Sequence, residues 1–116
     1  MIAARSKRLR LTGRECGLIG DALAEPRRWQ ILRQISKSAN PVPRNTLQKT
    51  QPISAATLSY HLRELQNAGL IEIRREGNFA SLVLRRDVLH AYVQHLVAMY
   101  TKNVSCPVTP STDGGE

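Results

Sequence analysis

The 116-residue sequence has few of the groups on which catalytic or disulfide-stabilised proteins depend. Its two cysteines, Cys16 and Cys106, lie far apart, so we expect free thiols in a reducing cytosol. Three histidines and nine acidic residues form no nucleophile–base pair and no metal-binding cluster, and there is no glycine-rich phosphate loop. The sequence therefore predicts neither an enzyme nor a bound metal or other cofactor.

Long apolar runs are also missing. None approaches the roughly 20 residues of a membrane-spanning helix, and the first ten residues lack the apolar core of a signal peptide. We therefore expect a bacterial-type cytoplasmic protein with no membrane partner. Acidic residues are in the minority, with 9 Asp and Glu against 17 Lys and Arg and a formal net charge of +8. Such a balance is typical of a protein that binds a polyanion, and nucleic acid is the obvious candidate.

The strongest pattern lies in residues 53–84. Ser54 can accept a backbone N–H and begin a helix, whose apolar stripe at helical spacing is Leu58, Leu62 and Leu65. Residues 67–69, Asn-Ala-Gly, end that helix because glycine easily adopts the left-handed conformation. The chain then changes to the period of a β-hairpin, with a charged tip at residues 74–78 and a return strand at 79–84.

The remaining segments predict further helices and two flexible ends. Thr12 and Glu15 have capping-box spacing, and Pro26 suits the first turn of a helix. The helices predicted on these and similar signals cover residues 13–24, 26–37, 44–50 and 85–102, with a linker at 36–43. We therefore divide the chain into a basic N-terminal arm (1–12), one folded domain (13–102) and a disordered C-terminal tail (103–116).

Two blocks of sequence resemble the ArsR-type winged-helix repressors. Residues 54–65, SAATLSYHLREL, followed by NAGLI and RREG, are similar to the recognition helix and wing of that family. Upstream, residues 22–32, ALAEPRRWQIL, are similar to its ALADPTRLRIL segment. The resemblance covers residues 21–96 and implies a mainly α fold with a small β-hairpin. That fold is a homodimeric winged helix-turn-helix with the order helix-helix-helix-helix-strand-strand-helix.

The last predicted helix has apolar residues around nearly its whole circumference, which one small domain cannot bury. A second copy related by a two-fold axis is the simplest cover. In the ArsR-type proteins the first and last helices form the dimer. The predicted interface residues are Cys16, Ile19, Leu89, Tyr92, Val93, Leu96, Met99 and Tyr100.

The predicted function is sequence-specific binding of double-stranded DNA by a transcriptional regulator, a repressor that binds an inverted-repeat operator as a homodimer. With the leucine stripe inward, the residues expected to face the major groove are Ala55, Ala56, Ser59, Tyr60 and Arg63, together with the capping Ser54. Phosphate contacts are expected from Arg44, Lys49, Arg74, Arg75 and Asn78. A protein-interaction module without specific DNA readout is the alternative, because Ala55 and Ala56 lie where the family is often polar.

The sensing sites that the resemblance suggests are not matched in this sequence. The family's Cys-x-Cys motif would lie near residues 44–50, where there is no cysteine, and Asp87, His90 and His95 lack the spacing of a metal site on one helix face. A remaining hypothesis assigns redox or metalloid sensing to Cys16 and Cys106. The alternative is that both thiols are inert, and the residues identify no inducer.

Overall fold

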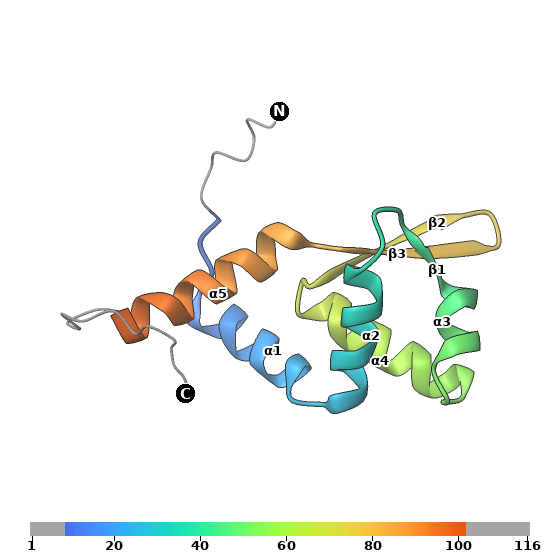
Figure 1. Cartoon of the computed structure of the whole chain (residues 1–116), viewed down its shortest axis with the longest axis horizontal. Helices are drawn as coiled ribbons and strands as arrows, with labels where there is room; N and C mark the ends of the chain where they lie inside the picture. The colour runs from blue at the N-terminus through green and yellow to red at the C-terminus, as the bar shows by residue number, and fades with distance from the viewer. Residues whose placement is uncertain (1–8, 102–116) are drawn as a thin grey trace, which may run out of the picture.

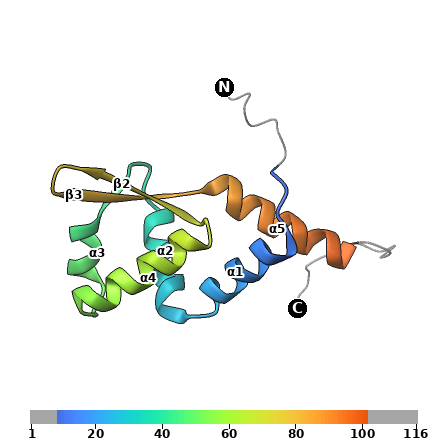
Figure 2. The same cartoon turned by 180° about the vertical axis from the view of Figure 1, so that it is seen from behind.

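The computed structural model describes residues 9–101. Five helices and a small sheet make up this part of the chain (Figure 1). Their bounds are α1 Gly13–Leu23, α2 Pro26–Ser36, β1 Val42–Pro43, α3 Arg44–Thr50, α4 Ala55–Asn67, β2 Ile71–Glu76, β3 Phe79–Leu84 and α5 Arg86–Thr101. The fold is the predicted winged helix-turn-helix. Helices α1 and α5 lie together at one end of the molecule, and the tip of the β2–β3 hairpin lies at the other (Figures 1 and 2).

The helices begin where local signals in the sequence place their starts. Thr12 and Glu15 form a reciprocal capping box at α1. The Glu15 N–H donates to the Thr12 hydroxyl at 3.1 Å, and the Thr12 N–H donates to the Glu15 carboxylate at 2.8 Å. Pro26 is the first residue of α2, and the Ser54 hydroxyl caps α4. Gly69 follows α4 with a φ of 82°, the left-handed conformation that a glycine allows at little cost. These predictions are confirmed.

The sheet has three strands rather than the two of the predicted hairpin. β1 pairs antiparallel with β3, and the strand order is β1-β3-β2. Prediction of residues 36–43 as a plain linker was therefore wrong at its end, where Val42 is buried and pairs with Leu82. Pro43 fits because β1 is an edge strand, where the missing N–H leaves no ladder bond unmade. The strand is only two residues long, too short for an alternating pattern.

The predicted charged tip at residues 74–78 is also shorter in the structure. β2 continues through Arg74 and Arg75 to Glu76, which pairs with Phe79, so Gly77 and Asn78 alone form the turn. Gly77 has a φ of 59°, which suits a tight two-residue hairpin turn. The two arginines thus lie on a paired strand, where their side chains point to opposite faces.

One apolar core joins the helices to the inner face of the sheet. Ile19 of α1, Ile31 of α2 and Leu47 of α3 are fully buried in it. Leu58, Leu62 and Leu65 of α4 are buried as the stripe predicted, and Leu70, Ile71 and Leu82 close the core under the sheet. Because Ile19 is 0% exposed within a single protomer, its predicted role in a dimer interface is wrong, and it is a core residue.

Candidate nucleic-acid interface

The outer face of α4 is the part of the predicted DNA contact that the structure exposes most clearly. Ala55, Ala56 and Arg63 are exposed, and Tyr60 retains 49% of its accessible surface. The opposite face carries the three buried leucines and the buried His61. Ser59 lies at the edge of the exposed face and is half-buried. The exposed face of α4 therefore presents two methyl groups, a phenol and a guanidinium to solvent.

Ser54, which was expected to face DNA, is occupied in the helix cap. Its hydroxyl accepts the Thr57 N–H at 3.1 Å and donates to the Thr57 hydroxyl at 3.0 Å. Both side chains are exposed, so the cap lies on the surface of the motif. The cap explains why α4 begins at Ala55, and any contact of Ser54 with DNA stays a prediction.

Arg44 and Ser59 bind each other. The Arg44 guanidinium donates to the Ser59 hydroxyl at 2.6 Å and to the Ala55 carbonyl at 3.1 Å. The first residue of α3 is thereby fastened to the first two turns of α4. Lys49, in the last turn of α3, is exposed. Arg44 and Lys49 were both predicted to contact phosphate. Arg44 is hydrogen-bonded to α4, whereas the Lys49 side chain is exposed.

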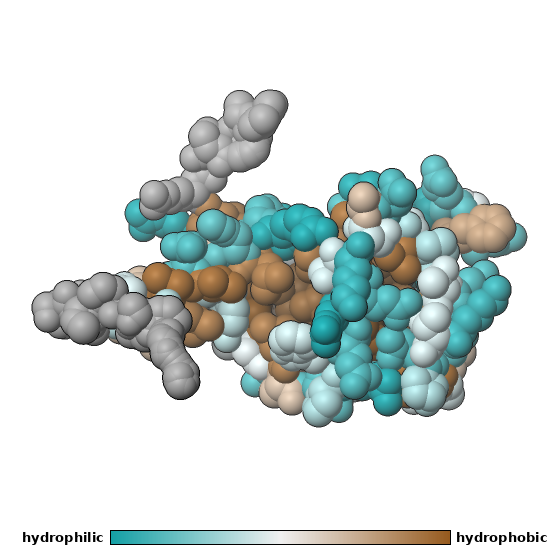
Figure 3. All heavy atoms as spheres, viewed as in Figure 1, coloured by the Kyte–Doolittle hydropathy of each residue, from teal (hydrophilic) through white to brown (hydrophobic). Residues whose placement is uncertain are grey.

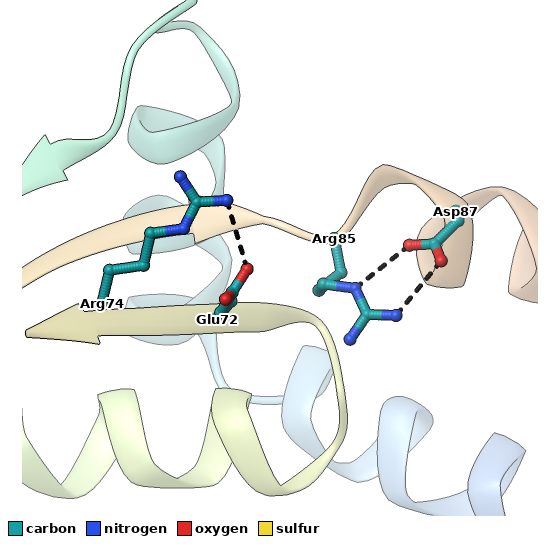
Figure 4. Close-up of polar contacts among 4 residues, drawn as sticks. All are labelled: Glu72, Arg74, Arg85 and Asp87. Atoms are coloured by element: carbon teal, nitrogen blue, oxygen red, sulfur yellow. Dashed lines mark hydrogen bonds and ion pairs between the residues drawn. The ribbon is translucent and has the colours of Figure 1, made fainter. Parts of the chain in front are cut away.

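The hairpin separates the two arginines predicted to contact phosphate. Arg75 pairs with Ala80 and continues the face of Ile71 and Ile73, which turns toward the helices. Arg74 is on the other face and forms an exposed ion pair with Glu72 at 3.4 Å (Figure 4). Such exposed pairs contribute little to stability. Arg75 and the turn residue Asn78 are exposed. Arg75 is therefore the arginine on the helix side of the hairpin.

A cluster that the sequence did not predict lies behind Tyr60. Arg28 of α2 lies 3.3 Å from Nδ1 of His61, and its guanidinium carbon lies 5.8 Å from the centroid of the Tyr60 ring. His61 is 8% exposed, so its ring is buried within the protomer. Its pKa is lowered from 6.5, first because burial disfavours the charged ring and then because Arg28 and Arg27 repel it, while Glu25 acts in the opposite direction.

The lowered pKa of His61 predicts a pH dependence of stability. In the unfolded chain His61 binds a proton near pH 6.5, whereas the folded protein resists that proton until lower pH. Stability should therefore fall as the pH decreases through 6.5 and stop falling from this cause below the folded pKa. We expect the urea midpoint to decrease from about pH 7.5 to about pH 5, and to decrease less in His61→Asn, which keeps an acceptor without a titrating ring. Equal pH dependence in both proteins would contradict this assignment.

Comparison with known proteins places this geometry in a family. Residues 23–74 match the model of a helix-turn-helix domain family. An ArsR-like transcriptional regulator from Rhodococcus sp. RHA1 superposes with a TM-score of 0.67 and 23% identity, over 76% of this chain and 81% of that one. A possible transcriptional regulatory protein from Mycobacterium bovis, fragment 1–100, has a TM-score of 0.60 and 26% identity, over 74% and 91%. The fold is that of the ArsR-type winged helix-turn-helix regulators, and residues 23–74 have the sequence of a helix-turn-helix domain family.

Two further comparisons bear on this assignment. A homodimeric winged helix-turn-helix DNA-binding domain from Mycobacterium bovis, a possible ArsR-family regulator solved in solution, has a TM-score of 0.60 and 24% identity, over 82% of this chain and 87% of that one. No curated protein sequence matches the chain. The match to a helix-turn-helix domain family, rather than any missing cluster, supports the prediction that the protein is not an enzyme.

At the end of this ArsR-type fold away from the hairpin, apolar side chains gather over α1 and α5 (Figure 3). The exposed fractions on α5 are 45% for Val93, 43% for Leu96, 68% for Met99 and 55% for Tyr100. Leu18 of α1, which the sequence analysis did not select, is 41% exposed. Leu89 and Tyr92 are half-buried against the core, so they contribute only part of their surface to this face.

The predicted sensing residues are only partly described. Cys16 is a free, half-buried thiol on α1, and Cys106 lies outside residues 9–101. The Asp87 carboxylate pairs with Arg85 and not with His90 or His95. It accepts two hydrogen bonds from Arg85, at 3.2 and 3.1 Å, which lower the pKa of Asp87 (Figure 4). Between Leu9 and Thr101 no three His, Cys, Asp or Glu side chains come together as a metal site, and no helix is long and apolar enough to cross a membrane.

Proposed function

We propose that this regulator represses transcription by binding an inverted-repeat operator as a homodimer. In this proposal α4 enters the major groove and the β2–β3 hairpin lies along the backbone. The observation that carries it is the division of the surface into two ends. The start of α4, helix α3 with Lys49 and the outer part of the hairpin with Arg75 lie toward one end, and the exposed apolar face of α1 and α5 lies at the other.

The roles proposed for individual residues follow from their exposure. Ala55, Ala56, Tyr60 and Arg63 are assigned to base edges, where the two methyl groups suit the methyl of thymine. Lys49, Arg75 and Asn78 are assigned to phosphates, and Arg74 only after it leaves Glu72. Arg44 and Ser59 take part chiefly by holding α3 to α4.

Dimerisation through α1 and α5 is supported by the exposed apolar residues of both helices and by the homodimeric Mycobacterium bovis relative. An isologous contact would cover the same face on both copies and leave both α4 helices free. The interface we propose comprises Cys16, Leu18, Leu89, Tyr92, Val93, Leu96, Met99 and Tyr100. As a DNA-binding protein the dimer would act in the cytoplasm on the nucleoid.

The experiment that tests this function is selection from randomised duplex DNA, followed by sequencing, with the full chain. An enriched inverted repeat is the expected result, and a reporter gene under that repeat should be expressed more strongly when the protein is absent. Uniform weak binding that disappears with salt would contradict specific readout and favour the protein-interaction alternative. The same selection with oxidised protein tests Cys16 and Cys106, since unchanged enrichment would contradict thiol sensing.

Phosphate contacts can be recognised by their salt dependence. We expect Arg75→Ala and Lys49→Ala each to weaken operator binding and to reduce the slope of log affinity against log salt by about 0.9 per protomer, because one fewer counterion is released. Arg14→Ala is the matched control, since Arg14 is an exposed arginine at the start of α1, at the end of the molecule away from the hairpin. Equal slopes for all three variants would contradict the assignment of Lys49 and Arg75.

A further inference from the structure

Arg28 is a half-buried side chain that joins three helices. It belongs to α2, and its guanidinium donates from Nε to the Ala22 carbonyl at 2.9 Å and from a terminal nitrogen to the Asp21 carbonyl at 3.4 Å. These carbonyls lie in the last turn of α1, which contains no basic residue of its own. The Asp21 carbonyl also accepts the Ala24 N–H at 3.3 Å, so the main contribution of Arg28 is a donor for the Ala22 carbonyl at the open end of the helix.

The same guanidinium reaches α4 on its other side. Its second terminal nitrogen lies 3.3 Å from Nδ1 of His61, and an arginine has only donors, so Nδ1 accepts and the ring proton is on Nε2. The guanidinium carbon lies 5.8 Å from the centroid of the neighbouring Tyr60 ring, within the range of a cation–π contact. The Tyr60 and His61 rings are 5.5 Å apart at their centroids and inclined by 54°.

Tyr60 thereby differs from the other exposed residues of α4. It is 49% exposed, yet its ring lies against a guanidinium that three hydrogen bonds, to Ala22, Asp21 and His61, hold in place. A side chain ordered before binding loses less conformational freedom when DNA arrives. Arg63, by contrast, is exposed on the same helix. A displaced Arg28 would release the support of Tyr60 without changing any atom on the surface assigned to DNA.

We propose that Arg28 is a positioning residue for DNA readout, which holds Tyr60 in the orientation that contacts the operator. This inference rests on the proposed function, because it requires that α4 read DNA. Arg28 itself touches no DNA in this proposal. Its loss should weaken specific binding by about threefold to tenfold, the range of a single cation–π contact, and should leave the salt slope unchanged.

A double-mutant cycle on the selected operator tests the proposal, with the full-length wild type, Arg28→Met, Tyr60→Ala and the double variant. If Arg28 acts through Tyr60, R28M weakens binding in the wild type and has no further effect in Y60A. If the two losses multiply, Arg28 has only a structural role and the proposal is overturned. Arg27→Met is the matched control, because the adjacent Arg27 binds Gln30 and Gln51 and should show no coupling to Tyr60.

Two additions keep the result decisive. Circular dichroism and urea unfolding at the assay temperature show whether R28M is folded, and if it is not, Arg28→Lys enters the same cycle, since it keeps the charge but not the several donors. Failure of the proposed function looks different: no sequence is then enriched by wild-type protein and no cycle can be run. Specific binding by the wild type with no loss in either Arg28 variant overturns this inference alone.

Discussion

Replacement of Leu96 by glutamate is expected to make the protein monomeric and to weaken binding to an operator with two half-sites by on the order of 100-fold or more. Leu96 is 43% exposed in the protomer, so the new carboxylate can remain in water and the core is undisturbed. In the proposed dimer the same carboxylate would be buried among apolar side chains without a partner, which is costly. Sedimentation and titration with one- and two-half-site DNA measure both effects.

Gln94→Glu is the matched control for this charge. Gln94 is exposed on the same helix, about half a turn away from Leu96, and should tolerate the carboxylate with no change in assembly. Binding to a single half-site should be similar in wild type, L96E and Q94E, because α4 is unchanged. If L96E remained dimeric with unaltered operator affinity, the dimer would not be formed through this face of α5.

Truncation of Leu58 to alanine is expected to lower the free energy of unfolding by about 2–5 kcal/mol. Leu58 is 0% exposed and lies on the buried side of α4, directly behind the face assigned to DNA. The substitution removes three carbons from a packed interior and leaves a cavity that the short helices can fill only in part. For a domain of this size that is a large share of its total stability. Urea unfolding at neutral pH gives the value.

Leu58→Met is the comparison, because it nearly conserves volume and should cost less than about 1.5 kcal/mol. Operator affinity is measured under conditions in which L58A is still folded, so that an effect on DNA binding is separated from the effect on stability. We expect it to weaken, since a loosened α4 no longer holds Ala55, Ala56 and Tyr60 in one arrangement. A loss below 1 kcal/mol, or one equal to that of L58M, would mean that Leu58 does not anchor the helix.

Several features could be predicted because their signals lie within a few residues of one another. The capping box of Thr12 and Glu15, the cap at Ser54 and the stop at Gly69 are each decided by hydrogen bonds or backbone conformation over one helical turn. The leucine stripe of α4 is likewise local, since helical spacing alone puts three side chains on one face. These local signals together predicted the bounds of α4 and the start of the hairpin.

What could not be predicted depends on contacts between distant parts of the chain. Arg28 and His61 are 33 positions apart, and no periodic pattern connects them. Val42 becomes a strand residue only because Leu82 is there to pair with it. Ile19 was assigned to the wrong surface because an apolar helix offers several faces, and only its neighbours decide which one the core takes. Leu18, one residue away, is the exposed one.

The bond between Arg44 and Ser59 limits how operator preference can be changed. Ser59 is an obvious position to vary, because it borders the exposed face of α4, but its hydroxyl also holds the first residue of α3. A larger side chain there would displace Arg44 and set free a guanidinium at the edge of the proposed DNA-binding face. The preference for bases and the affinity for DNA of any sequence would then change together. Positions 44 and 59 therefore have to be varied together when a new operator preference is sought.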